Sequence, residues 1–154
     1  MSKQRIPLIR QAAALKSYFP TSKITRKGDQ EITWIHDLHP TPLSSIYKVK
    51  LCYKKGKGIK ISVLEPYPLL RAEGIPDLPH VYSNEKQELC LYYPRDKEWT
   101  PNMYYVTTII PWISEWLLHY EIWVGTGIWT GGGIEHGPKE TTNSELENAS
   151  QIAS

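Results

Sequence analysis

Three consecutive segments between residues 31 and 66 alternate apolar and polar side chains, and this alternation constrains the fold more than any other feature. In the middle segment, "IYKVKLCY", the apolar side chains of one face are Tyr47, Val49, Leu51 and Tyr53. The segment "EITWIHDL" before it has Ile32 and Trp34 on one face and Thr33 and Ile35 on the other, and "IKISVLEP" after it places Ile59, Ile61 and Val63 inward. Side chains of a strand alternate between the two faces of a sheet. Short links, including the glycine-containing turn "KKGKG", therefore predict an antiparallel meander with one wet face.

Two helices are expected to complete the fold. Near the N-terminus, apolar residues recur at helical spacing, at Leu8, Ala12, Leu15 and Phe19. Pro7 suits the first turn of this helix and Pro20 ends it. A longer helix has its apolar side chains at Ile109, Ile113, Trp116, Leu117, Tyr120 and Val124. Because Trp112 and Trp123 widen its apolar face, we expect this helix to pack against the sheet on one side and loops on the other.

The ends of the longer helix also carry recognisable signals. Thr107 or Thr108 can cap its start, and Pro111 is tolerable in a first turn. Gly125 or Gly127 can end it. Helices and an antiparallel sheet in this order predict an α+β fold.

The remaining segments are predicted to be irregular. The stretch from Glu65 to Pro79 holds four prolines and should form an extended loop. "RDKEWTP" should form a polar loop before the long helix. From about residue 134 the sequence is polar, so we expect one domain at 1–133 and a mobile tail at 134–154.

Composition and charge exclude several classes of protein. The net charge of +2 over 154 residues demands neither a nucleic-acid nor a membrane partner. The most apolar stretch contains Glu115, His119 and Glu121, which a membrane-spanning helix rarely carries. The N-terminus has no signal-peptide pattern, and two cysteines do not make a disulfide framework. These features predict a cytoplasmic protein with reduced thiols.

Several candidate sites have simpler explanations. His36 and His39 are too few ligands for a structural metal, since zinc needs about four. "GTGIWTGGG" follows a helix and lacks the lysine and hydroxyl of a phosphate loop, so no nucleotide cofactor is expected. Cys52 lies mid-strand among lysines, where an incidental thiol is the preferred interpretation. Six lysines crowd residues 48–60, and we interpret them as the solvated face of the sheet.

Cys90, in "PHVYSNEKQELCLYYP", is the strongest candidate for chemistry. A lone cysteine is more often packed in the core than catalytic, but this one follows a proline-rich and polar loop, where function concentrates. His80, Tyr82, Ser83 and Asn84 precede it by a few residues and can donate or accept hydrogen bonds. Acyl transfer through a thiol needs an accessible sulfur and donors for the developing oxyanion. The residues around Cys90 can supply both.

The order of these elements resembles the ubiquitin-conjugating enzyme family over roughly residues 8–125. That family's catalytic cysteine lies ten residues after the histidine of a His-Pro-Asn tripeptide, and the interval from His80 to Cys90 is also ten. "LCL" around Cys90 looks like the family's "I-C-L", and "WTP" at 99–101 looks like its "W-S/T-P". The resemblance implies a conjugating-enzyme-like fold with an N-terminal helix, a β-meander, an active-site loop and a long central helix.

The resemblance also implies roles for individual residues. Cys90 would be the nucleophile, His80 would order the loop, and Tyr82 or Asn84 would support the loop or the oxyanion. Trp99 and Pro101 would shape a cover over the site. The sequence departs from the family because Val81 replaces the proline of the tripeptide and Tyr82 replaces its asparagine. The usual C-terminal helices are also missing, which leaves a shortened C-terminus.

This shortened form is similar to the stand-alone conjugating enzymes of bacterial CBASS anti-phage operons. The similarity implies a protein partner, a CD-NTase cyclic-oligonucleotide synthase. The enzyme would hold the synthase's C-terminal carboxyl as a thioester and pass it to an amine, which primes anti-phage signalling. Two alternatives stay open: a non-catalytic adaptor that binds the synthase, and a cysteine hydrolase with His80 or His119 as base.

Overall fold

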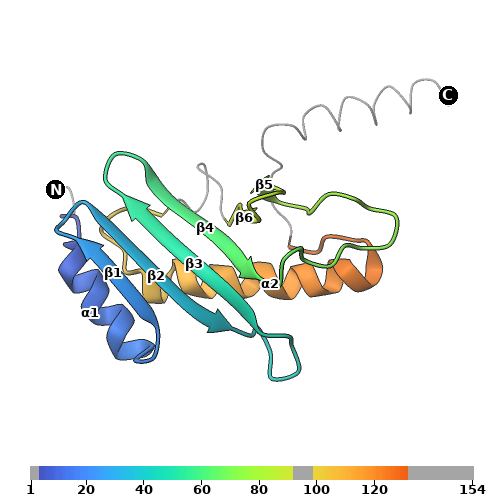
Figure 1. The fold of residues 1–154 in the computed structure, drawn as a ribbon, viewed down its shortest axis with the longest axis horizontal. Helices are drawn as coiled ribbons and strands as arrows, with labels where there is room; N and C mark the ends of the chain where they lie inside the picture. The colour runs from blue at the N-terminus through green and yellow to red at the C-terminus, as the bar shows by residue number, and fades with distance from the viewer. Residues whose placement is uncertain (1–3, 92–98, 132–154) are drawn as a thin grey trace.

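The computed structural model describes residues 4–91 and 99–131, and it confirms the α+β class (Figure 1). Its elements in chain order are α1 (Leu8–Tyr18), β1 (Lys23–Lys27), β2 (Glu31–Leu38), β3 (Tyr47–Lys54), β4 (Gly58–Glu65), β5 (Val81–Ser83), β6 (Glu88–Leu89), the short 3-10 helix η1 (Tyr105–Thr107) and α2 (Ile109–Thr126). The predicted tail at 134–154, and with it the domain boundary at 133, lies outside the described residues.

The sheet contains the predicted meander and extends beyond it. Its strand order is β1-β2-β3-β4-β6-β5, and every pair of neighbours is antiparallel. The alternation of β3 is confirmed, because Tyr47, Val49, Leu51 and Tyr53 are all buried while the residues between them are partly exposed. Two parts of the sheet were not predicted. The edge strand β1 pairs with β2, and the short hairpin β5–β6 joins the sheet beside β4.

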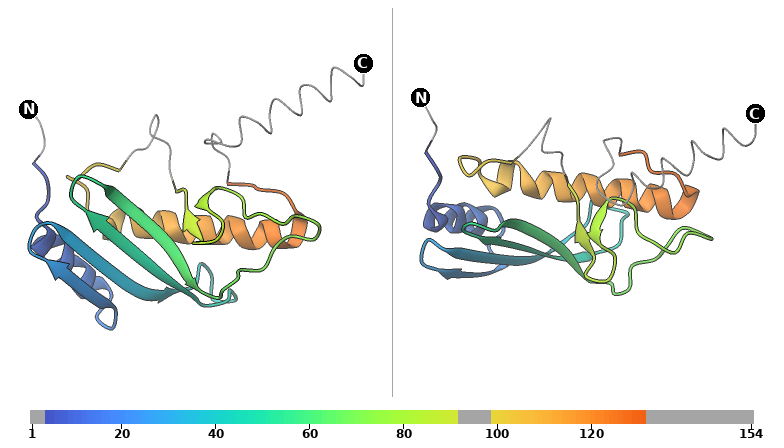
Figure 2. Two further views of the ribbon diagram at one scale, coloured as in Figure 1. Left: turned by 45° about the horizontal axis from the view of Figure 1, so that its top comes forward. Right: turned by 90° about the horizontal axis from the view of Figure 1, so that it is seen from above.

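Both helices cover the same face of the sheet, so the core is one layer between helices and strands (Figure 2). On the α1 side, Phe19 meets Trp34 of β2 edge to face, with ring centroids 5.3 Å apart. On the α2 side, Tyr120 meets Tyr47 of β3 at 6.1 Å in the same geometry. The other face of the meander carries Cys52 and the lysines and is open to solvent, as predicted.

The long helix confirms its predicted limits and corrects one detail. Gly127 ends α2 in the left-handed conformation, with φ 76°, which favours glycine. Thr108 stands at the N-cap position, but its side chain does not cap the helix. Its hydroxyl donates instead to the carbonyl of Tyr104, 2.7 Å away, because the chain enters α2 through η1 and not through an extended segment.

The proline-rich loop at 66–80 has neither helix nor strand, as predicted, and it runs beside the C-terminal half of α2 (Figure 1). The Tyr120 hydroxyl donates to the carbonyl of Leu70 at 2.6 Å. Burial raises the pKa of Tyr120 to about 12, so the hydroxyl remains a donor well above neutral pH. Glu121, the next residue of α2, accepts hydrogen bonds from Ser44 and Tyr47. These contacts fix α2 relative to the loop and the sheet.

Candidate functional site

The hairpin β5–β6 explains the ten-residue interval between His80 and Cys90. Val81 pairs with Leu89, so His80 and Cys90 are the next residues outward on the two arms of the hairpin. The Cys90 amide donates to the His80 carbonyl at 3.1 Å, which continues the ladder by one bond. The spacing therefore measures the length of a hairpin, and the structure brings these two predicted residues together.

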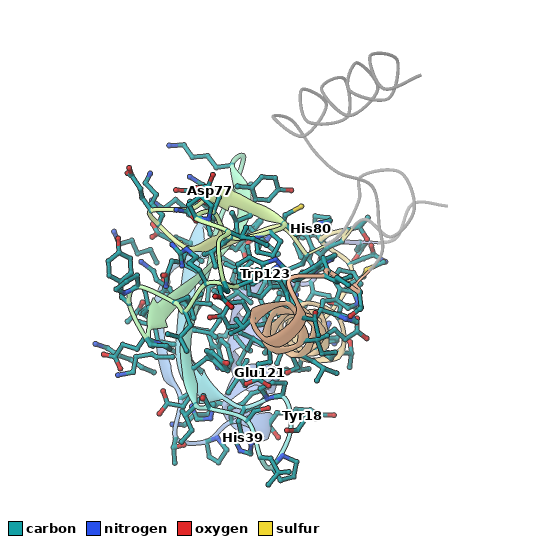
Figure 3. All side chains as sticks on the ribbon, turned by 90° about the vertical axis from the view of Figure 1, so that its right-hand side faces the viewer. Tyr18, His39, Asp77, His80, Glu121 and Trp123 are labelled. Atoms are coloured by element: carbon teal, nitrogen blue, oxygen red, sulfur yellow. The ribbon has the colours of Figure 1, made fainter. Side chains whose placement is uncertain are left out.

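The His80 carbonyl is held from a second side. The indole N–H of Trp116 in α2 donates to it at 3.0 Å, so one oxygen accepts bonds from both Cys90 and the long helix. His80 has φ 45°, a left-handed conformation that costs a non-glycine residue about 1–3 kcal/mol when the surroundings impose it. Figure 3, which looks along α2, shows His80 on one side of the helix and Glu121 on the other. The backbone at Cys90 is thus tied to α2 through His80.

The His80 ring lies in an aromatic cluster. It stacks on Trp129, with ring centroids 4.8 Å apart and planes 23° apart. Trp129 also contacts Trp116 at 5.6 Å and His119 at 5.8 Å. The His119 ring hydrogen-bonds the Thr130 hydroxyl at 2.9 Å. The chain after α2 therefore folds back onto the loop beside Cys90, and sequence analysis missed Trp129 because it lies beyond the helical pattern.

Cys90 itself directly follows β6 and is 8% exposed. It lies between buried Leu89 and half-buried Leu91. Residues 92–98, which follow, lie outside the described residues. The position thus combines a fixed backbone with a small exposed fraction of the side chain.

Tyr82 and Asn84 lie in the hairpin in different environments. Tyr82 is at a β-bulge between Val81 and Ser83, and the residue is 61% exposed. A bulge turns a side chain out of the regular alternation, which accounts for that exposure. The Asn84 side-chain oxygen accepts from the Leu78 amide at 2.9 Å and from the Arg71 guanidinium at 3.4 Å. Asn84 is therefore placed to hold the loop, and Tyr82 to meet solvent.

Gln87 is the site residue that sequence analysis missed most completely. Its side chain is fully buried between the hairpin and the proline-rich loop, and its backbone has φ 50°. Its amide nitrogen donates to the carbonyls of Val63 at 2.9 Å and Pro66 at 3.1 Å, and its oxygen accepts from the Leu69 amide at 2.8 Å. One side chain thus supplies three bonds to loop and strand backbone that has no ladder partner there. A glutamine between charged residues gives no sign of such burial in the sequence.

Trp99 and Pro101 lie near α1. The Trp99 ring packs against Tyr53 at 5.8 Å and Tyr105 at 5.6 Å, and the Pro101 carbonyl accepts from the Ile6 amide at 2.9 Å. None of these described contacts involves Cys90. A cover over the site formed by Trp99 and Pro101 stays a prediction.

The two histidines weighed as metal ligands have other contacts. His36 packs against the rings of Phe19 and Trp34, and a His39 ring nitrogen hydrogen-bonds the Thr41 carbonyl at 3.1 Å. Across residues 4–91 and 99–131, no three side chains of His, Cys, Asp or Glu gather where they could share a metal ion. In the same ranges, no helix has the length and apolar character to cross a membrane.

The sheet order, the two helices on one face and a cysteine after the hairpin are consistent with a ubiquitin-conjugating-enzyme-like fold. A family model described as "Type II CBASS E2 protein" matches residues 11–137, which is most of the chain. The chain therefore belongs to this family, and its role is conjugating-enzyme-like, within CBASS antiviral defence and alongside other CBASS proteins. A search of the curated proteins finds no match.

Proposed function

We propose that the protein is an acyl transferase that uses Cys90 as its nucleophile. The observation that supports this most is the bond from the Cys90 amide to the His80 carbonyl, which is itself bonded to Trp116. A nucleophile reacts faster when its backbone is fixed before the reaction, because the entropy of orienting it has already been lost on folding. Family membership supports this class of reaction, and the fixed backbone supports Cys90 as the residue that carries it.

The reaction consists of two exchanges at one carbonyl carbon. The Cys90 thiolate attacks an activated C-terminal carboxyl of the partner, a new C–S bond forms, and the donor's leaving group departs with its electron pair. An amine then attacks the thioester, a C–N bond forms, the Cys90 thiolate leaves, and the amine loses a proton to solvent. The partner in this proposal is a CD-NTase synthase, and activation of its carboxyl takes place on another protein.

The adduct experiment uses a synthetic thioester of the synthase's C-terminal peptide as donor. Mass spectrometry should find the acyl group on Cys90, and thiol reductant should remove it. Cys90→Ala should abolish the adduct, Cys90→Ser should leave at most a slow, reductant-resistant ester, and Cys52→Ser should react like the wild type. A thiol-cleavable acyl adduct that persists in Cys90→Ala overturns the assignment.

One observation favours the adaptor instead: only 8% of Cys90 is exposed, whereas Cys52 is half-buried. An adaptor's Cys90 should react with iodoacetamide no faster than Cys52 under native conditions. The proposed nucleophile should react faster. The hydrolase hypothesis differs in that the thioester peptide would be turned over to free acid with no amine present.

A further inference from the structure

The outer face of the sheet has a hollow that the proposed reaction does not use. It encloses about 270 Å³ and lies on the face turned away from the helices. We call it the lysine groove, and its lining residues are Lys50, Cys52, Lys54, Lys57, Gly58, Lys60, Ser62, Lys86 and Glu88. It is thus formed by β3, β4 and β6 with the turns beside them.

The register of the strands explains why this face is hollow. Cys52 is opposite Lys60, Lys50 is opposite Ser62, and Ser62 is opposite Glu88 on β6. Cys52 and Ser62 have small side chains and Gly58 has none, so they form the floor of the hollow, and the long lysine side chains surround it. Alternation places every second residue on this face, so the lysines along β3 recur at about 7 Å intervals or multiples of it.

The lysine groove carries a larger positive charge than the chain as a whole. Five lysines and one glutamate give it a net charge of +4, whereas the whole chain has +2, so the rest of the molecule sums to −2. None of the five lysines forms an ion pair with any residue in the described parts of the chain. Like charges on neighbouring positions of a sheet repel one another. A bound anion would relieve that repulsion.

From this arrangement we infer that the lysine groove binds an extended, carboxylate-rich segment of a partner protein. Lys50 and Lys54 of β3 are four residues apart on one face, and carboxylates four residues apart in an extended peptide repeat at the same interval of about 13 Å. Nucleic acid fits less well, because sites for single strands use aromatic platforms and none of the lining residues is aromatic. Arginine, which suits phosphate by bidentate bonding, is also missing from the lining. This binding does not depend on Cys90 being a nucleophile.

The binding experiment uses a short fluorescent peptide of alternating glutamate and serine. A matched peptide of glutamine and serine and an oligothymidine of similar length are the comparison probes. The glutamate peptide should bind more tightly than both, and its affinity should fall with added salt. Replacing Lys50, Lys54 and Lys60 together by glutamine should weaken binding by about tenfold or more.

A control variant and a footprint separate the groove from general charge. Arg10→Gln with Lys16→Gln and Lys23→Gln, all exposed and away from the groove, makes the same change in net charge and should bind like the wild type. In a Cys90→Ser background, Cys52 is the only cysteine, and the glutamate peptide should slow its reaction with iodoacetamide. The inference is overturned if neither peptide binds at low salt, if oligothymidine binds more tightly, if both triple variants lose affinity equally, or if Cys52 is not protected.

Discussion

The α1 end and the hairpin end of the molecule each contain a buried glutamine that binds backbone groups, but only the hairpin end carries the candidate nucleophile, Cys90. At the α1 end, buried Gln11 donates to the Met103 carbonyl at 2.9 Å and accepts from the Tyr105 amide at 3.1 Å. At the hairpin end, buried Gln87 makes three such bonds. Each glutamine satisfies backbone groups that have no partner in the sheet ladder. A buried carboxamide is therefore a structural device in this fold and not in itself a mark of function.

The difference between the ends lies in what the fixed backbone presents. At the α1 end the glutamine holds η1 and its approach to α2, next to a closed aromatic cluster around Trp99. At the hairpin end, Gln87 holds the loop that leads to His80, and His80 binds the Cys90 backbone. Substitutions at the α1 end should therefore lower the stability alone. Substitutions at the hairpin end should lower both the stability and the rate of acyl transfer to Cys90.

The largest expected effect is that of Gln87→Ala. It leaves two carbonyls and one amide in the interior without their partner, at a cost of about 2–4 kcal/mol in the free energy of unfolding. Chemical denaturation measures this loss. The rate at which Cys90 takes the acyl group from a peptide thioester should fall as well, because the loop no longer fixes His80.

Gln11→Ala is the matched control for that prediction. It should lower the free energy of unfolding by a similar amount, about 1–3 kcal/mol, while Cys90 reacts at the wild-type rate wherever the variant is folded. Gln30→Ala, at an exposed turn, should change neither quantity. Equal loss of transfer in both buried-glutamine variants would mean that the two ends do not differ in function.

A smaller effect is expected from Trp116→Phe, which tests the bond from α2 to His80. Phenylalanine keeps an aromatic ring but removes the N–H that donates to the His80 carbonyl at 3.0 Å. The loss should cost about 1 kcal/mol of stability and slow acyl transfer to Cys90 by about three- to tenfold. Trp123→Phe, in the same helix, is the control, since its indole N–H bonds to nothing within 4–91 and 99–131. Slowing by both variants alike would point to packing in α2 and away from the hydrogen bond.

The parts of the fold that the sequence predicted are those where periodicity is long. Eight-residue alternation placed β2, β3 and β4 with the correct faces, and the 3.6-residue period placed α2 within a residue or two of its ends. The edge strand β1 was not predicted, because four of its five residues are exposed and it has no apolar face that a sequence pattern could reveal. β5 and β6 were not predicted, because strands of three and two residues are too short to show an alternation of apolar and polar side chains.

The candidate site likewise has residues that the sequence could predict and residues that it could not. His80 and Cys90 could be paired from the sequence through the family's interval, and the hairpin gives that interval a physical cause. Gln87, Trp116 as a donor and Trp129 as a stacking partner could not be predicted, because each acts through a contact between segments far apart in the chain. Local patterns report which face is buried, and they carry no information on which buried polar group meets which backbone.

The smallest expected effect concerns the α1 end alone and depends on pH. Asp29 accepts from the Leu8 amide at 2.8 Å and from the Arg5 guanidinium, so it serves the start of α1, where Pro7 has no side-chain cap to offer. The hydrogen bond with Arg5, and then that with Leu8, lowers the pKa of Asp29 from 3.8 to about 2. Because the folded state favours the carboxylate, its contribution to stability is complete above about pH 4 and is lost as the pH falls toward 2.

Asp29→Asn should therefore lower the melting temperature at pH 7, and the gap to the wild type should narrow between pH 4 and pH 2. Thermal unfolding followed by circular dichroism measures the gap, and Asp37→Asn, exposed on β2, should show none. Acyl transfer to Cys90 at pH 7 should not change, since Asp29 belongs to the α1 end and Cys90 to the hairpin end. A gap that stays constant down to pH 2 would show that the Asp29 side chain acts by its shape and not by its charge.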